Sequence, residues 1–135
     1  MENEVHLLIA EDDNEDWMLI EESLETCSGV RWERVRNGQE LLDRLQEKIP
    51  HMILLDLRMP RRDGFWALRE IRSDPKLRHI PVTILTASED EKDIVRSYTE
   101  GANAYLTKPP SFDEMHRLIS KNYEFWMKTA RIPQA

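Results

Sequence analysis

Five short apolar segments recur along the chain, and each is followed by a longer segment whose apolar residues have helical spacing. The apolar segments are residues 5–10, 30–35, 52–55, 80–85 and 104–106. Parallel strands need long connections, which are usually helices and which form right-handed crossovers. The alternation therefore predicts an α/β fold in which helices cover both faces of a five-stranded parallel sheet.

Local signals refine these elements. Residues 52–55 are uniformly apolar, as in a strand covered on both faces, whereas residues 30–35 alternate apolar and charged residues, as in an edge strand. Gly38 opens the second predicted helix and Gly101 closes the fourth. The last predicted helix is long and amphipathic and extends to Trp126.

Composition excludes several classes of protein. The net charge of −7 repels nucleic acid, so we expect no binding to DNA or RNA. No apolar run approaches the roughly 20 residues of a membrane span, and no cationic secretory leader is present. Cys27 is the only cysteine, so no internal disulfide forms, and we expect a cytoplasmic protein. No linker interrupts the pattern, which predicts one domain at 1–127 and a short tail at 128–135.

Side chains that can bind metal ions or take part in reactions directly follow the predicted strands. Glu11 and Asp12 follow the first strand and Asp56 the third, whereas Thr86 follows the fourth and Lys108 the fifth. Carboxylates brought to one sheet edge repel each other unless a cation joins them, and Mg²⁺ suits carboxylate and phosphate oxygens. A carboxylate beside such a metal can attack phosphorus and become an aspartyl phosphate. These strand ends therefore predict a metal-dependent phosphoryl site.

Four blocks of the chain resemble the signature blocks of two-component response-regulator receiver domains, the CheY-like family. They are residues 8–12, 54–64, 84–87 and 104–109. The resemblance extends from Val5 to about Trp126. It implies a doubly wound (βα)5 flavodoxin/CheY-like fold with strand order 2-1-3-4-5, and it implies a phosphorelay switch.

The resemblance also implies how the phosphoryl group is handled. Asp56 is implied to accept it, Thr86 to hydrogen-bond it and Lys108 to pair with another of its oxygens. Tyr105 matches the switch aromatic of the family, whose ring turns inward on phosphorylation. The family's Lys–Pro bond is usually cis, which implies a cis bond between Lys108 and Pro109.

A Mg²⁺ site is implied by the same resemblance. Asp12 and Asp56 are implied to bind the ion directly and Glu11 mainly through water, with the backbone carbonyl of Arg58 as a further ligand. Asp13 lies one position beyond the usual acidic pair and is left out of the site. Arg58 also stands where the family tunes the lifetime of the phosphoryl group.

The last residues of the chain predict the partners. No output domain follows the last predicted helix, so we expect signalling through contact with another protein. The loop at 73–82 and the tail that includes residues 123–126 resemble small response regulators that partner bacterial phytochrome histidine kinases. We therefore expect a sensor histidine kinase, of the phytochrome type, as phosphodonor. Phe125 and Trp126 fit either a core or a dimer contact, and we expect a homodimer through the last helix and its neighbouring strand.

Each assignment has an alternative reading. The acidic run can be simple helix capping, Asp56 an ordinary turn, Thr86 a helix cap, Lys108 a solvated lysine and Tyr105 plain packing. A flavodoxin-like cofactor binder needs a phosphate-binding first loop rich in small residues, where this chain is acidic. A phosphatase of the aspartyl-phosphate type needs a second acid two residues after the nucleophile. The alternative function is a receiver-like binding module that works without phosphorylation.

Overall fold

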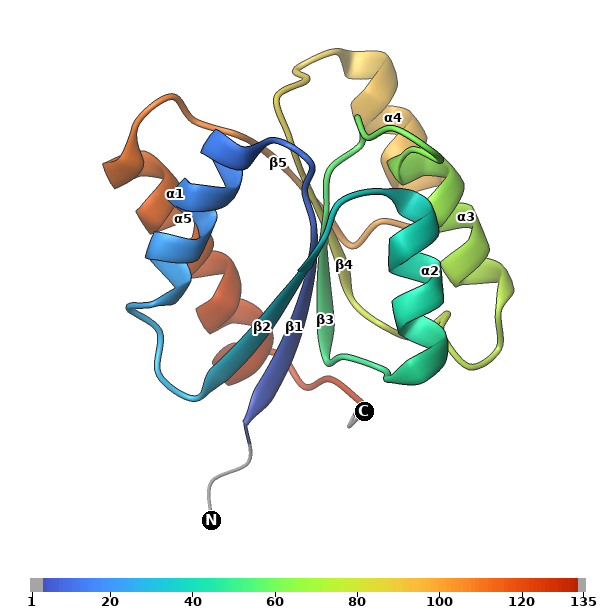
Figure 1. Ribbon diagram of the computed structural model, residues 1–135, viewed down its shortest axis with the longest axis horizontal. Helices are drawn as coiled ribbons and strands as arrows, with labels where there is room; N and C mark the ends of the chain where they lie inside the picture. The colour runs from blue at the N-terminus through green and yellow to red at the C-terminus, as the bar shows by residue number, and fades with distance from the viewer. Residues whose placement is uncertain (1–3, 134–135) are drawn as a thin grey trace.

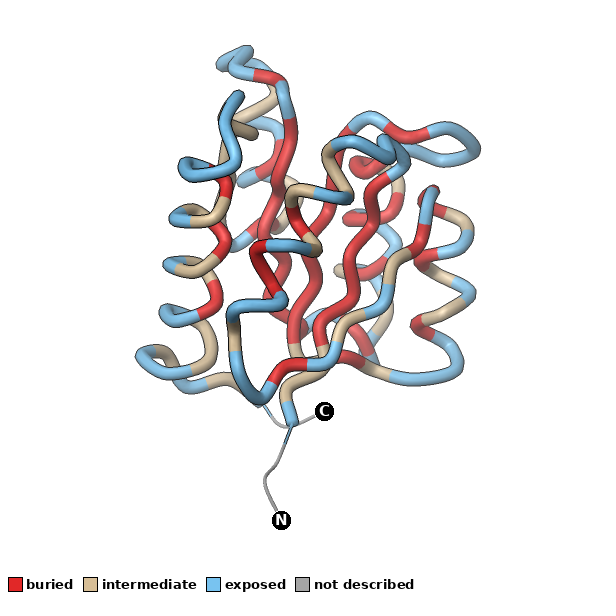
Figure 2. The backbone as a smooth tube through the Cα atoms, turned by 60° about the vertical axis from the view of Figure 1, so that its left-hand side comes forward, coloured by how far each residue is buried: buried red, intermediate tan, exposed pale blue. Residues whose placement is uncertain are grey.

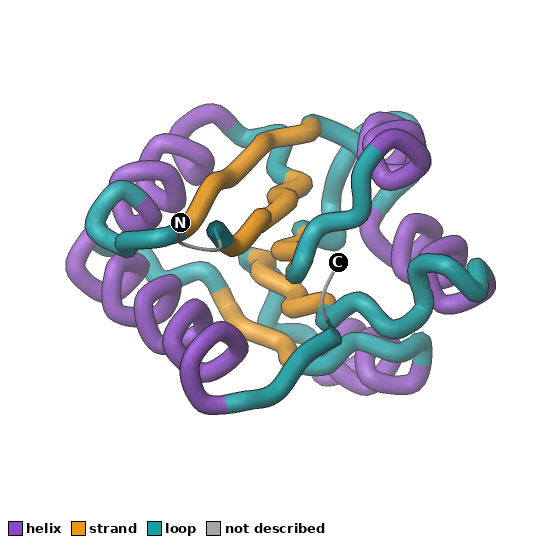
Figure 3. Tube along the Cα trace, turned by 90° about the horizontal axis from the view of Figure 1, so that it is seen from below, coloured by secondary structure: helices purple, strands orange, loops and turns teal. Residues whose placement is uncertain are grey.

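The sheet and its two helical layers follow directly from the apolar segments. A computed structural model describes residues 4–133 and contains a five-stranded parallel sheet in the order β2-β1-β3-β4-β5. Helices α1 and α5 cover one face, and α2, α3 and α4 cover the other (Figure 1). Seen from below, the strands lie between the two layers of helices (Figure 3). This arrangement and its strand order confirm the predicted fold.

The elements alternate along the whole described chain. In order they are β1 (Val5–Ala10), α1 (Asn14–Leu24), β2 (Val30–Val35), α2 (Gly38–Glu47), β3 (Met52–Leu55), α3 (Gly64–Ser73), β4 (Val82–Thr86), α4 (Glu91–Thr99), β5 (Ala104–Thr107), α5 (Phe112–Glu124) and the π-helical turn η1 (Phe125–Thr129). Within the described part of the chain, no helix is both long and apolar enough to cross a membrane.

Several predicted boundaries differ from the structure. Strands β4 and β5 end at Thr86 and Thr107, one residue later than predicted. Strand β4 begins at Val82 rather than Ile80, because Pro81 has no N–H to give to the sheet. The last helix is α-helical only to Glu124 and then widens into η1, where the Ala130 N–H donates to the Phe125 carbonyl at 2.7 Å. The predicted domain boundary at 127/128 lies within η1 and stays a prediction.

Two apolar clusters on opposite faces of the sheet hold the layers together. Leu8, Ile53 and Ile84 pack toward α2 and α3, whereas Ile9 and Leu54 pack toward α1 and α5. The central strands are buried along most of their length (Figure 2). Burial on both faces explains why these strands are uniformly apolar.

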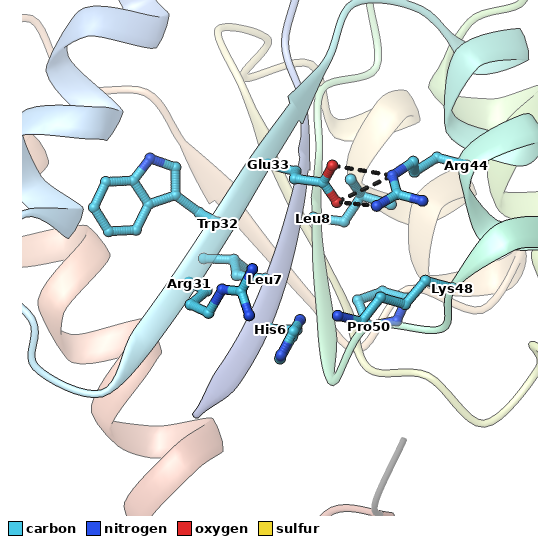
Figure 4. A pocket seen from close by; sticks show the side chains of 9 residues that line it. All are labelled: His6, Leu7, Leu8, Arg31, Trp32, Glu33, Arg44, Lys48 and Pro50. Atoms are coloured by element: carbon cyan, nitrogen blue, oxygen red, sulfur yellow. Dashed lines mark hydrogen bonds and ion pairs between the residues drawn. The ribbon is translucent and has the colours of Figure 1, made fainter. Parts of the chain in front are cut away.

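Strand β2 is the partly exposed edge strand that its alternating sequence predicts. Its Glu33 forms an ion pair with Arg44 of α2, with 2.9 Å between Glu33 Oε1 and Arg44 Nη2. The pair lies at a groove that is also lined by His6 and Lys48 (Figure 4). This pair ties α2 to the edge of the sheet. At the other edge, α4 leaves its apolar residue Val95 54% exposed.

Each of the five described α-helices begins with a side-chain cap in the loop that leads from the preceding strand. The capping residues, each accepting a hydrogen bond from a backbone N–H in the first turn, are Asp13, Asn37, Asp63, Asp90 and Ser111. These caps fix the loops that leave the strands. The same loops carry the predicted phosphoryl site.

Candidate metal and phosphoryl site

The carboxyl ends of four strands bring the predicted site residues to one edge of the sheet. Strand β1 pairs with β3 so that Ala10 lies beside Leu55, which places Glu11 next to Asp56. Strand β4 pairs with β5 so that Thr86 lies beside Thr107, and Lys108 follows. The Lys108 backbone N–H donates to the Thr86 carbonyl at 2.7 Å, which fixes the start of the last loop against β4.

The Lys108 ammonium contacts three carboxylates at this edge of the sheet. Its Nζ lies 2.7 Å from Oδ2 of Asp56, 2.8 Å from Oε1 of Glu11 and 2.7 Å from Oδ2 of Asp16. An ammonium has three N–H groups, so three carboxylates use all of them. The Lys108 side chain is only 7% exposed, and these bonds are therefore made largely away from solvent.

Asp16 is the member of this group that sequence reasoning missed. It lies in the first turn of α1, whereas Asp12 precedes the helix cap Asp13. Its place in the acidic run at residues 11–16 was the signal available in the sequence. The side chain is 32% exposed, so Asp16 closes the site from the solvent side.

Three carboxylates form a candidate cation site beside Lys108. Glu11, Asp12 and Asp56 each offer an oxygen, and these oxygens lie within 4.8 Å of one another. Glu11 and Asp56 are buried, whereas Asp12 is exposed and opens the cluster to water. An all-oxygen set of acids with access to water fits a hard divalent ion such as Mg²⁺. Asp13 caps α1 instead, in agreement with its exclusion from the predicted site.

Burial and neighbouring charge shift the pKa values of the site. Burial, and then the adjacent Asp56 charge, raise the pKa of Glu11 to about 7, although Lys108 opposes this shift. Burial alone would lower the pKa of the Lys108 ammonium, but the Asp56 charge and the bonds to three carboxylates raise it above its ordinary value. Lys108 therefore stays charged. An additional cation would stabilise the ionised form of the Glu11 carboxylate.

Thr86, the last residue of β4, has a buried hydroxyl. The residue is fully buried, and its Oγ1 makes no hydrogen bond to the described part of the chain. A buried hydroxyl without a partner costs about 1–3 kcal/mol, so an oxygen acceptor brought to the site would stabilise it. A phosphoryl group on Asp56 would supply such oxygens.

Arg58 and Tyr105 occupy the rim of the site. The Arg58 N–H donates to Oδ1 of Asp56 at 3.2 Å, and the Arg58 guanidinium extends outward to within 4.0 Å of the Asp93 carboxylate. The Tyr105 hydroxyl donates to the Ser88 carbonyl at 2.9 Å, which holds its ring beside the loop before α4. The metal-ligand role of the Arg58 carbonyl and the switch role of Tyr105 stay predictions.

One expectation from the family resemblance is wrong in this structure. All described peptide bonds are trans, including Lys108–Pro109. The Lys108 N–H, on the amino side of that peptide bond, is bonded to Thr86, and the Lys108 side chain reaches the carboxylates.

Comparisons with known proteins agree with this geometry. The family profile described as response regulator receiver domain matches residues 7–120. The probable methanogenesis regulatory protein FilR2 of Methanothrix harundinacea is 39% identical over 94% of this chain and 86% of its own length. Response regulator Rcp1 of Synechocystis sp. is 35% identical over 96% of this chain and 93% of its own length.

Solved structures show the same likeness. The phosphorylated cyanobacterial phytochrome response regulator RcpA has a TM-score of 0.93 and is 34% identical, with 97% of this chain and 99% of that chain covered. The Mn²⁺-bound form of Rcp1 has a TM-score of 0.89 and is 33% identical, with 96% of this chain and 99% of that chain covered. The chain therefore belongs to the response regulator receiver domain family.

Proposed function

We propose that this receiver domain is a phosphorelay switch in which Asp56 accepts a phosphoryl group from a histidine kinase, with Mg²⁺ held by the neighbouring carboxylates. The observation that carries the proposal is the Asp56 carboxylate, 2.7 Å from the Lys108 ammonium and within one cluster of acidic oxygens. The Mn²⁺-bound relative supports a divalent ion, and the all-oxygen ligand set supports Mg²⁺.

Each site residue has its own role in phosphoryl transfer. An Asp56 oxygen attacks phosphorus, an O–P bond forms, and the P–N bond of the donor phosphohistidine breaks with its electron pair passing to the imidazole. Lys108 stabilises the charge on the equatorial oxygens, and the Thr86 hydroxyl donates to one of them. Bound Mg²⁺ would supply further positive charge to the same oxygens, held by Glu11 and Asp12.

We propose that hydrolysis of the aspartyl phosphate resets the switch. A water oxygen forms a bond to phosphorus, the bond from phosphorus to the Asp56 oxygen breaks, and a water proton passes to the phosphate. Arg58 follows Asp56 by two residues, and its guanidinium is exposed at the rim toward Asp93. A long cation there controls how water approaches the phosphoryl group.

The partner kinase is proposed from the relatives. RcpA is a phytochrome response regulator, and this chain is similar to it over nearly its whole length. We infer a sensor histidine kinase of the phytochrome type as phosphodonor, and we propose that this chain works in the cytoplasm.

We propose that the output is contact with a protein, including a second copy of the chain. On α4, Val95 and Tyr98 are about half exposed, and so is Phe125 next to the end of α5. Sedimentation at tens of micromolar, with and without a phosphoryl mimic, tests the homodimer. A monomer under both conditions contradicts it.

Phosphorylation itself is tested directly with a small phosphodonor. The protein is incubated with Mg²⁺ and acetyl phosphate, and its intact mass is measured. We expect a gain of one phosphoryl group in the wild type and none in Asp56→Asn or with excess chelator. If the wild type gains no mass, or if Asp56→Asn gains as much, the proposal fails and the phosphorylation-independent binding module becomes the better explanation.

A further inference from the structure

We propose that Asp16 is a positioning residue that anchors Lys108 throughout the phosphorylation cycle. The proposal rests on the proposed function, because it assigns Asp16 a task in the same phosphoryl transfer. The observation behind it is the contact of 2.7 Å between Lys108 Nζ and Asp16 Oδ2, which joins α1 to the loop after β5.

The other two partners of Lys108 change during the cycle. Glu11 and Asp56 belong to the carboxylate cluster, so a bound divalent ion draws on their oxygens. Asp56 changes again when one of its oxygens becomes part of an acyl phosphate and the carboxylate charge is lost. The contacts of Lys108 with Glu11 and Asp56 therefore cannot hold its ammonium in one position throughout the cycle.

Asp16 is held in position independently of these changes. It is not part of the carboxylate cluster, and it is held by the first turn of α1, where its own N–H donates to the Asp13 cap at 2.9 Å. A carboxylate at a helix N-terminus is also favoured by the helix dipole. Asp16 can therefore remain bonded to Lys108 while the deeper carboxylates engage metal and phosphoryl group.

A fixed third bond orients the whole ammonium group. With one N–H directed at Asp16, the other two are directed into the site, toward the Glu11 and Asp56 oxygens. Without Asp16, the ammonium is free to turn and to follow the most negative oxygen, which carries it away from the position where the phosphoryl charge develops. Small displacements of a charge-stabilising group cost substantial rate.

The test compares Asp16→Asn with Glu15→Gln. Glu15 is an exposed acid in the same helical turn, so Glu15→Gln removes the same charge from the first turn of α1 without touching Lys108. Phosphorylation by acetyl phosphate is followed at saturating Mg²⁺. We expect the maximal rate to fall about tenfold in Asp16→Asn, to stay within twofold of wild type in Glu15→Gln, and to recover at least partly in Asp16→Glu.

Each outcome has a defined meaning. A wild-type rate in Asp16→Asn overturns the inference, and so does an equal loss in Glu15→Gln, which would indicate a general charge effect. If the wild type itself accepts no phosphoryl group, the proposed function fails rather than this role of Asp16. A nitrogen-detected NMR signal of the Lys108 ammonium, recorded in wild type with Mg²⁺ and a beryllofluoride mimic, gives a second test that needs no variant. Retention of the Asp16 contact supports the inference, and its loss overturns it.

Discussion

Replacing Gly38 by alanine is expected to displace the loop that carries Arg58. Gly38 opens α2, and its N–H donates to the Arg62 carbonyl at 2.8 Å, across to the loop between β3 and α3. A Cβ at position 38 would overlap the Arg62 carbonyl oxygen and lie 3.0 Å from its carbonyl carbon. Carbon atoms in good contact are about 3.5–4.0 Å apart, so the loop has to move by about 0.5–1 Å.

The loop has little freedom to absorb this movement. Arg61 and Arg62 have φ values of 47° and 84°, a left-handed region that costs non-glycine residues about 1–2 kcal/mol each. The Arg62 guanidinium lies over the Trp66 ring at 5.0 Å, which holds the far side of the loop against α3. Overpacking against such a backbone costs about 1–3 kcal/mol, offset by up to about 1 kcal/mol from the better helix propensity of alanine.

We therefore expect Gly38→Ala to lower the free energy of unfolding by about 1–2 kcal/mol. Urea unfolding followed by circular dichroism measures the loss. Gln39→Ala, one position along the same helix, is the control for introducing alanine there, and it removes only an exposed hydrogen bond to Asp43. If the Arg58 carbonyl on the displaced loop is a metal ligand, as predicted, the Mg²⁺ concentration needed for half-maximal phosphorylation should also rise several-fold. A Gly38→Ala variant as stable as wild type would refute the steric argument.

Two further predictions concern Glu11 and Arg72. Because the pKa of Glu11 is raised to about 7 from 4.5, the folded metal-free protein binds more protons than the unfolded chain between these values. The free energy of unfolding should therefore fall as the pH rises from about 4.5 to 7, and this trend should flatten in Glu11→Gln. The Arg72 guanidinium donates to the carbonyls of Gly101, Arg78 and Ile80 and to the Asn103 amide oxygen, at 2.8–2.9 Å. Arg72→Met should cost about 2–3 kcal/mol in thermal or urea unfolding, and a loss below 0.5 kcal/mol would contradict this.

Most of the sheet could be predicted because burial on both faces leaves a plain record in the sequence. Residues 52–55 are apolar throughout and form β3 with the same bounds. Helix α4 shows where this reasoning stops. Its apolar residues have helical spacing, yet Val95 and Tyr98 are exposed, and the fully buried member is the polar Ser97. Spacing identifies a helix, but it does not say which of its faces meets the sheet.

Most members of the site could be predicted, but their contacts could not. Glu11, Asp56 and Lys108 follow strand ends, and parallel strands bring such positions together whatever the side chains are. The bond between Asp16 and Lys108 joins residues 92 positions apart and depends on how closely α1 approaches the loop after β5. No local pattern encodes that approach, because it is set by the packing of α1 against α5.

The charges at this edge also imply an order of events. Three carboxylates, those of Glu11, Asp16 and Asp56, contact one buried ammonium, and Asp12 lies beside two of them, so the site has a net negative charge before any ligand binds. A phosphoryl donor is itself an anion, and its approach to this edge is opposed until positive charge is added. We therefore predict that divalent-ion binding precedes phosphoryl transfer, whatever the donor. If this reasoning is correct, phosphorylation rates plotted against Mg²⁺ concentration should extrapolate to nearly zero without the ion, rather than to a residual rate supplied by Lys108 alone.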